Sequence, residues 1–295
     1  MGAPVTRILV GIDASPAAQR ALHWAAGLAV ATGASVDVVF AWWPDQSELP
    51  PSIADREHER AHARVTDWCR PLREAGVTHQ GRPIEGEARH VLAREVERTR
   101  PDLAVIGARR SESGVALGLG AVTHHLTHPL RVPLAVVPGT DFGTGPLVAG
   151  IDGSNANLAA LRWAAALALQ LARPIEAVCA PYPRFPKGGL DPAGWRWGDE
   201  DDVHAEVEKV RAEHGHVPLL FVADEDPRSA VEQIASRDHA EAIIVGSRGW
   251  GGLHGLMLGK VTHELLRHSN RPVIVVPHDH EVHLGRERYD DTPAA

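Results

Sequence analysis

Short, nearly continuous runs of Val, Ile, Leu and Ala alternate along this chain with longer segments whose apolar residues recur at helical spacing. Residues 7–11 form the first such run, and residues 17–31 follow it with an amphipathic pattern that ends before Gly33. Apolar runs without alternation are typical of parallel strands that are covered on both faces. Strands that alternate with helices favour parallel pairing through right-handed crossovers. The pattern therefore predicts an α/β fold.

The same alternation predicts the remaining elements. In the first half we expect strands over 7–11, 35–41, 78–84, 103–107 and 134–137, with helices over 17–31, 53–74, 88–98 and 121–127. In the second half we expect strands over 147–151, 175–180, 219–223, 242–246 and 273–276, with helices over 159–171, 203–214 and 229–236. Residues 182–202 are rich in Pro and Gly, and we interpret them as a solvated loop, with a lid or contact surface as the alternative.

The sequence also repeats itself with an offset of 139 residues. The segment Gly11 to Ser15 returns as Gly150 to Ser154, and the register holds to the last strand, where Val137-Pro138 returns as Val276-Pro277. A repeat of this length is a whole domain. We therefore expect two tandem doubly wound domains, over 1–138 and 146–278, with a flexible linker over 139–145 and a polar tail over 279–295.

Composition narrows the class of protein. The chain has 295 residues, which allows about two domains, and its 44% hydrophobic and 23% charged residues are ordinary for a globular protein. A net charge of −8 argues against nucleic acid as a partner, because phosphate binding needs a basic face. No apolar run approaches the roughly 20 residues of a membrane span. Cys69 and Cys179 do not occupy equivalent positions in the repeat, which argues against a structural disulfide. We expect a cytoplasmic protein.

Two features recur at the ends of strands, where open parallel sheets bind ligands. The first is an aspartate, Asp13 and then Asp152, which follows the first strand of each half. The second is a glycine-containing loop after the fourth strand, with Gly107, Arg110 and Gly120 in the first half and Gly246, Gly249 and Gly259 in the second. Each feature alone is more often a helix cap or a turn. Their joint recurrence favours a phosphate site, because glycine lets the backbone approach a phosphate and the helix beyond offers unpaired N–H groups.

Standard nucleotide and metal motifs do not account for these loops. Gly259-Lys260 is similar to the end of a P-loop, but His254 stands in place of the first glycine and Val261 in place of the metal-binding hydroxyl.

We assign no catalytic residue and no metal site. Three closely spaced histidines near the polar C-terminus are interpreted as a solvated tail rather than as metal ligands: His278, His280 and His283.

Both halves resemble universal stress proteins nearly from end to end. The family's loop has Gly, two residues, Gly, nine residues, Gly and then Ser or Thr, and it accompanies the aspartate after the first strand. The resemblance implies a five-stranded parallel sheet of order 3-2-1-4-5 in each half and, in the nucleotide-binding branch of the family, a site for ATP, with or without Mg²⁺. It also implies association through the fifth strands, here 134–137 and 273–276, either within one chain or in a homo-oligomer.

Carried over by position, the resemblance implies a role for each matching residue. The aspartates Asp13 and Asp152 would contact the nucleoside of ATP. The ends of the second strands would meet adenine through their backbone, at Ala41 and Ala180. The phosphates would lie against the glycine loop of the second half, at Gly246, Gly249 and Gly259.

The chain departs from the family's loop in both halves. Lys260 replaces the Ser or Thr, and it could offer a charge to a phosphate oxygen in place of a hydroxyl. In the first half Arg110 replaces the second glycine and Ala121 replaces the hydroxyl. Arg110 could either pair with phosphate or close the site with its bulk. These departures make the second half the better candidate for ATP binding.

The function that the resemblance implies is a cytoplasmic stress-response protein that binds ATP as a regulatory ligand. No paired base and nucleophile recurs in both halves, as an enzyme built by duplication would retain, so we expect no dedicated catalysis, although slow hydrolysis stays open. One alternative is a nucleotide-free interaction module in which Arg110, Ala121 and Lys260 mark decayed ATP sites. Another is an enzyme acting on adenylylated substrates, for which the sequence offers no catalytic signature.

Overall fold

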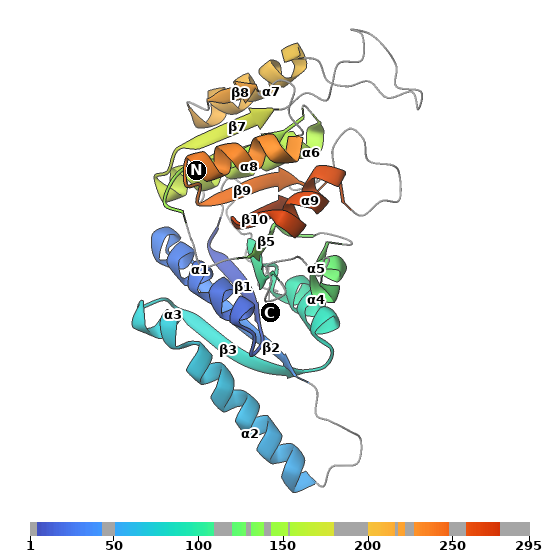
Figure 1. Cartoon of the computed structure of the whole chain (residues 1–295). Coiled ribbons are helices and arrows are strands. Elements are labelled where there is room, and N and C mark those ends of the chain that lie inside the picture. Colours follow the sequence, from blue (N-terminus) through green and yellow to red (C-terminus); the bar gives the residue numbers. More distant parts are fainter. Residues whose placement is uncertain are drawn as a thin grey trace, which may run out of the picture.

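The computed structural model describes residues 5–42, 51–108, 120–127, 131–138, 143–152, 154–179, 200–215, 218–221, 227–247 and 258–277. In these residues the chain folds into two α/β halves whose strands join in one sheet (Figure 1). The α/β fold that the hydrophobic pattern predicts is therefore confirmed.

Each half contributes strands and helices in alternation. The strands of the first half are β1 (Arg7–Ile12), β2 (Ser35–Trp42), β3 (His79–Glu85), β4 (Leu103–Gly107) and β5 (Leu134–Val137), and its helices are α1 (Pro16–Thr32), α2 (Pro51–Trp68), α3 (Arg70–Glu74), α4 (Ala88–Thr99) and α5 (Ala121–Leu126). The strands of the second half are β6 (Leu147–Ile151), β7 (Ile175–Cys179), β8 (Leu219–Phe221), β9 (Ala242–Gly246) and β10 (Val273–Val276), and its helices are α6 (Asn155–Leu171), α7 (Glu200–His214), α8 (Pro227–Arg237) and α9 (Lys260–His268).

The sheet formed by the described strands has the order β3-β2-β1-β4-β5-β10-β9-β6-β7-β8. Each half thus has the order 3-2-1-4-5, and its strands are parallel. The halves meet where β5 pairs antiparallel with β10, and Val136 lies opposite Val273 in this pair. The fifth strands therefore pair within one chain, which is one of the two arrangements that the resemblance implied. Association between chains stays a prediction.

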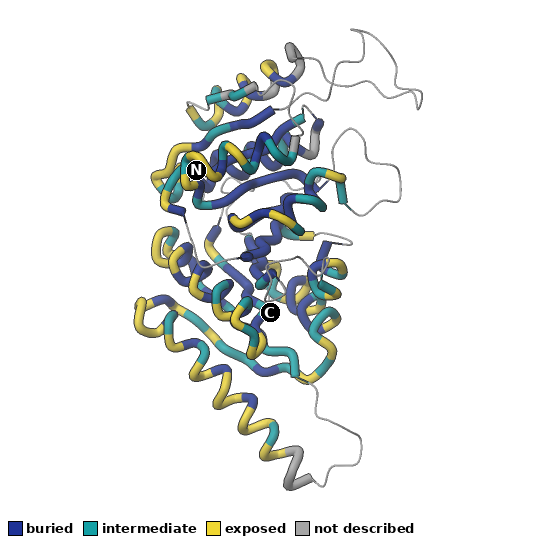
Figure 2. Tube along the Cα trace, in the orientation of Figure 1, coloured by how far each residue is buried: buried dark blue, intermediate teal, exposed yellow. Residues whose placement is uncertain are grey.

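Helices cover both faces of the sheet and enclose two apolar cores. Helices α1, α2, α3, α6 and α7 pack on one face, whereas α4, α5, α8 and α9 pack on the other. Figure 2 shows the strands at the centre as mostly buried. Trp24 and its repeat Trp163 lie in the core on the face that α1 and α6 cover. They are 4% and 1% exposed, so they serve core packing. Across the junction, the Gln170 side chain donates to the carbonyl oxygen of Val5 at 2.8 Å and thereby ties α6 to the first half.

The first helix of each half begins with the same cap. The Ser15 hydroxyl accepts the N–H of Ala18 at 3.2 Å, and the Ser154 hydroxyl accepts the N–H of Asn157 at 3.4 Å. Serine is among the best N-cap residues because its oxygen satisfies an N–H that has no partner within the helix. These caps fix where α1 and α6 start, directly after the two aspartates that the sequence singles out.

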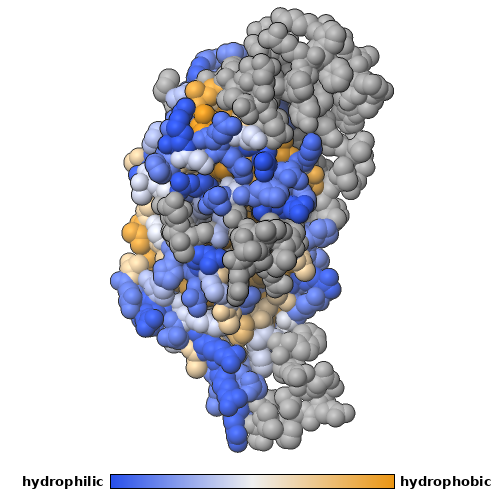
Figure 3. All heavy atoms as spheres, in the orientation of Figure 1, coloured by the Kyte–Doolittle hydropathy of each residue, from blue (hydrophilic) through white to orange (hydrophobic). Residues whose placement is uncertain are grey.

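The long helix predicted over 53–74 is wrong in one respect, because the structure divides it. Helix α2 ends at Trp68 and α3 begins at Arg70. Pro71 explains the break, since proline has no N–H to donate and its ring clashes with the preceding turn. Much of α2 is exposed, and Figure 3 shows a mostly hydrophilic surface in the lower part of the view, where α2 lies in Figure 1.

The predicted start of α7 is also wrong. The sequence predicts this helix over 203–214 after a loop over 182–202, whereas the helix begins at Glu200, within the acidic residues 199–202. Acidic residues favour the first turn of a helix, because the helix dipole is positive there. Residues 180–199 lie outside the described residues, as do the tail and its three histidines.

The end of the linker is packed rather than flexible. The N–H of Gly145 donates to the carbonyl oxygen of His239 at 3.0 Å. A Cβ atom at Gly143 would lie 2.0 Å from the same oxygen and 2.1 Å from that of Ala240. These glycines are therefore required for close backbone contact with residues 238–240, which directly follow α8, not for freedom of motion. The sequence pattern could not separate these two uses of glycine.

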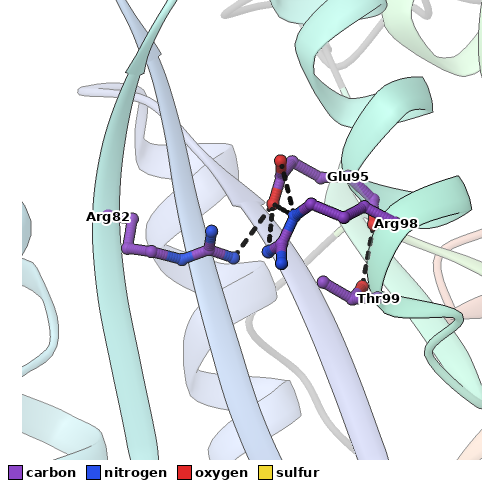
Figure 4. A network of polar contacts seen from close by, with 4 residues as sticks. All are labelled: Arg82, Glu95, Arg98 and Thr99. Atoms are coloured by element: carbon purple, nitrogen blue, oxygen red, sulfur yellow. Dashed lines mark hydrogen bonds and ion pairs between the residues drawn. The ribbon is translucent and has the colours of Figure 1, made fainter.

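A buried carboxylate joins α4 to the edge of the sheet (Figure 4). Glu95 is 4% exposed and accepts hydrogen bonds from Arg98 at 2.7 Å and from Arg82 of β3 at 2.9 Å. The Thr99 hydroxyl donates to the Glu95 carbonyl oxygen at 2.8 Å. Burial alone would raise the pKa of the Glu95 carboxyl, but the hydrogen bonds and charges of Arg98 and Arg82 outweigh burial, and the pKa is lowered.

Because the pKa of Glu95 is lower in the folded chain than in the unfolded chain, its stabilising contribution is present above the unfolded pKa of about 4.3. The contribution is lost as pH falls through the folded value. We expect Glu95→Gln to lower the free energy of unfolding by about 1–2 kcal/mol at neutral pH and to make its decline in acid shallower. Urea unfolding at pH 7 and at a series of acidic pH values measures both effects.

The matched control is Glu74→Gln, which removes an exposed carboxylate that lies 4.0 Å from Arg70. Exposed pairs of this kind contribute little, so the control should keep the stability and the acid profile of the unmodified chain. An acid profile for Glu95→Gln that overlays the unmodified chain would contradict the assignment.

Candidate functional site

The candidate site of the second half lies where the strand order reverses beside β6. This strand pairs with β7 on one side, with Ile151 opposite Cys179, and with β9 on the other, with Ala149 opposite Ile244. The three strands are parallel, so they end at the same edge of the sheet. Asp152 follows β6 and Ser247 follows β9 at this edge. A reversal of strand order is where open α/β sheets bind ligands.

The Asp152 carboxylate is held in a defined orientation. Its Oδ1 atom accepts the N–H of Ser154 at 2.9 Å and the side-chain amide N–H of Asn157 at 2.6 Å. Asp152 is half-buried, whereas Asn157 is 8% exposed. Two donors on one oxygen fix a carboxylate in space, as a residue that recognises a ligand requires.

Asn157 also connects this carboxylate to the end of the neighbouring strand. Its Oδ1 atom accepts the N–H of Gly246, the last residue of β9, at 2.9 Å. The Thr262 hydroxyl of α9 donates to the carbonyl oxygen of the same glycine at 2.8 Å. Both backbone polar groups of Gly246 are therefore engaged inside the protein. In this structure Gly246 positions Asn157 and Thr262, and the phosphate contact expected for Gly246 stays a prediction.

Helix α9 begins directly beside the end of β9. The N–H of Gly259 donates to the carbonyl oxygen of Ser247 at 3.0 Å, so the two ends of the glycine loop are joined. Gly259 is the N-cap of α9 and has no side chain to satisfy the first N–H groups of the helix. Lys260 is the first helical residue and is exposed. The start of α9 is therefore suited to binding an anion.

The first half keeps the same topology with different side chains. Asp13 accepts the N–H of Ser15 at 2.9 Å, as its repeat does, but Asp13 is exposed. The position equivalent to Asn157 is Ala18, which is buried. Its methyl side chain cannot donate a hydrogen bond to a carboxylate. A Cβ atom at Gly107 would lie 2.4 Å from the carbonyl carbon of Ala17. Gly107 therefore serves the close packing of α1 against β4.

The other predicted site residues that the structure describes lie near the ends of their strands and helices. Ala41 lies near the end of β2, opposite Ile84 of β3, and is half-buried. Gly120 is the N-cap of α5 without a side-chain bond, and Ala121 is the exposed first residue of that helix. Three predicted site residues lie outside the described residues: Arg110, Ala180 and Gly249.

Neither cysteine is suited to be a nucleophile, because both are shielded from solvent. Cys69 and Cys179 are buried, and neither forms a disulfide. Burial raises the pKa of the Cys69 thiol, although the nearby charge of Arg73 opposes the shift. A thiol with a raised pKa is a poor nucleophile, because the thiolate is the reactive form.

Comparison with known protein families gives two matches along this chain. The model of the universal stress protein family matches residues 4–138 and again residues 144–277. The chain belongs to the universal stress protein family. The resemblance stated from the glycine loops and the aspartates is thus confirmed, including its tandem arrangement.

Individual universal stress proteins match over nearly the whole length. A universal stress protein of Mycobacterium tuberculosis H37Rv is 25% identical, and the match covers 91% of this chain and 95% of that protein. One from Mycolicibacterium smegmatis is 27% identical, with 91% and 96% covered. The crystal structure of a universal stress protein from Archaeoglobus fulgidus has a TM-score of 0.75 at 17% identity, and the match covers 94% of this chain and all of that one.

None of the described helices combines the length and apolar character that crossing a bilayer requires.

Within these two universal stress protein domains, sequence reasoning missed Asn157. The repeat itself held the signal, because position 157 has a polar amide where the equivalent position 18 has alanine. Sequence reasoning also assigns no site role to Thr262. It is buried, and it also holds Gly246.

Replacing Asn157 with alanine, as in the first domain, should destabilise the second domain. The change removes the amide that bonds to Asp152 and leaves the N–H of Gly246 without its partner. A buried donor without a partner costs about 1–2 kcal/mol. Denaturant unfolding measures the loss, and the double variant Asp152→Ala/Asn157→Ala should lose less than the sum of the two single changes. Strict additivity would show that the two side chains act independently.

Proposed function

We propose that this universal stress protein binds ATP in its second domain and uses ATP as a regulatory ligand in a stress response. The observation that carries the proposal is the oriented carboxylate of Asp152, which Asn157 links to the end of β9 beside the start of α9. A nucleotide presents hydroxyl donors on its ribose and negative charge on its phosphates. An acceptor after β6 and a helix start after the neighbouring strand β9 support the proposal, because a helix start favours negative charge.

The residues present fit ATP by the chemistry of their groups. The Asp152 carboxylate would accept hydrogen bonds from the nucleoside, since an ionised carboxylate only accepts. The first N–H groups of α9, together with Lys260, would hold phosphate oxygens. Bound ATP would bring Mg²⁺ to its phosphates, and the ion would neutralise part of their charge.

We also propose that the protein has no dedicated catalytic activity and that it acts in the cytoplasm. The buried cysteines and the raised pKa of the Cys69 thiol support the absence of thiol catalysis. The reducing cytoplasm agrees with two cysteines that do not form a disulfide.

The first domain is proposed to stabilise the second rather than to bind ATP itself. Its aspartate is exposed, and alanine replaces the amide that would hold it. Pairing of β5 with β10 makes the two domains parts of one sheet. A nucleotide-free interaction module stays the second candidate, because Lys260 departs from the family's loop.

Nucleotide retained by the purified protein tests the proposal. The full chain is purified without added nucleotide and denatured, and the released small molecules are separated by chromatography. The experiment is repeated after incubation with Mg²⁺ and ATP followed by gel filtration. We expect adenine nucleotide in one or both samples, in an amount that approaches one per chain. Its absence from both samples would contradict the ATP proposal and favour the interaction module.

A further inference from the structure

Helix α2 carries two histidines that stand one turn apart. Residues 58–62 read His-Glu-Arg-Ala-His, which is the H-E-x-x-H pattern of helices that bind zinc. Residues four apart lie on the same face of a helix, so His58 and His62 are neighbours on α2. Both histidines are exposed, and a dissolved ion can reach them.

The two rings already have the spacing of a chelate. The Nε2 atom of His58 lies 3.1 Å from that of His62, and the ring centroids are 4.6 Å apart. Two imidazole nitrogens that each lie about 2.0–2.1 Å from one metal ion are separated by about 2.9 Å at a right angle and about 3.3 Å at the tetrahedral angle. The observed separation falls between these values. Without metal, the same spacing allows one ring to donate an N–H to the other.

We propose that His58 and His62 bind one divalent transition metal ion on the surface of α2. Imidazole ligands suit Cu²⁺, Ni²⁺ and Zn²⁺, and Cu²⁺ binds tightest in the usual order for divalent ions. Among the described residues there is no group of three or more His, Cys, Asp and Glu that could hold a metal. Within the described part of the chain, the two histidines are therefore the protein ligands of the proposed site, and water would complete the coordination. Such an open site exchanges its ion, and it differs from a protease centre, which has three protein ligands.

Trp42 provides an optical reporter for this site. Trp42 is the last residue of β2, and its ring centroid lies 5.9 Å from that of His58. A paramagnetic Cu²⁺ ion on the histidine pair would quench the fluorescence of an indole at this distance. The contact also places the ion beside the end of β2, one residue beyond Ala41.

Copper titration of the full chain tests the site. Because the chain has 18 histidines, the readout is a difference between variants. We expect the unmodified protein to bind one more Cu²⁺ per chain than His58→Ala/His62→Ala, as measured by equilibrium dialysis. Each single variant should bind this ion at least about tenfold more weakly, because it loses the chelate. Exposed helix positions accept alanine, so the variants keep the fold, which circular dichroism checks.

His23→Ala is the matched control. His23 is an exposed histidine on α1 whose ring nitrogen lies 2.9 Å from the carbonyl oxygen of Gln19. This variant should keep the additional ion. Trp42→Phe should keep the ion and lose most of the fluorescence quenching that occurs at the first equivalent. Equal Cu²⁺ uptake by the unmodified chain and the double variant would overturn the proposal, and so would single variants that bind the ion as tightly as the unmodified chain.

Discussion

Asp152→Ala should weaken ATP binding by at least about tenfold, which is about 1.4 kcal/mol, whereas Asp13→Ala should leave it unchanged. The two aspartates follow equivalent strands, but they differ in what holds them. Both aspartates accept the N–H of the serine two residues on, but only Asp152 also accepts the amide of Asn157, while Asp13 is exposed. A carboxylate that is already oriented loses little freedom when ligand binds, and so contributes more to affinity. Equilibrium dialysis with labelled ATP measures both variants.

Asp152→Asn is the matched control for this pair of variants. An asparagine keeps an oxygen that can accept from Ser154 and Asn157, but it removes the negative charge. Binding by this variant should lie between that of Asp152→Ala and that of the unmodified chain. Equal weakening by Asp13→Ala and Asp152→Ala would contradict the difference between the domains.

Gly107→Ala should lower the free energy of unfolding by about 3 kcal/mol and leave ATP binding by the folded protein unchanged. An added Cβ would lie 2.4 Å from the carbonyl carbon of Ala17, 2.5 Å from its oxygen and 2.8 Å from the nitrogen of Ala18. All three are backbone atoms of α1, so the helix itself has to move away from β4. Urea unfolding measures the loss of stability, and dialysis at low temperature measures ATP binding.

Gly27→Ala is the control, because it makes the same chemical change in open space. Gly27 lies within α1, and an added Cβ there meets nothing within 4 Å. Alanine is the better helix former by about 1 kcal/mol, so this variant should be slightly more stable. Loss of ATP binding in folded Gly107→Ala would show that Gly107 serves the ligand, contrary to the packing role.

The fold could be predicted because its signals are local or repeated. Continuous apolar runs separated by helical patterns gave the α/β class, and the offset of 139 residues gave two copies of one domain. Details at element boundaries and in the linker were wrong. Helix α7 begins at Glu200, inside the predicted loop over 182–202. The helix over 53–74 divides before Pro71, a breaker that is visible in the sequence, and the packed glycines Gly143 and Gly145 were interpreted as flexible. A glycine required for close contact looks the same in sequence as one in a free linker.

The candidate site could be predicted only in part. Asp152 and Gly259 stood out because they recur after strands and in the family's loop. The roles of Asn157 and Gly246 depend on a hydrogen bond between residues that are 89 positions apart, which only the folded sheet brings together. Gly107 was assigned to phosphate because the backbone of α1 that it contacts cannot be seen in a pattern of residue types. Position-by-position comparison of the two domains would have revealed Asn157 against Ala18.

Calorimetric titration of the full chain with ATP and Mg²⁺, after bound nucleotide has been removed, tests whether the second domain alone binds ATP. We expect one ATP bound per chain, because Asp152 is held by Asn157 and the first domain has Ala18 in that place. Two equivalent sites per chain would contradict the proposed difference between the domains. No heat of binding across the titration, together with no ATP retained in dialysis, would contradict ATP as the ligand.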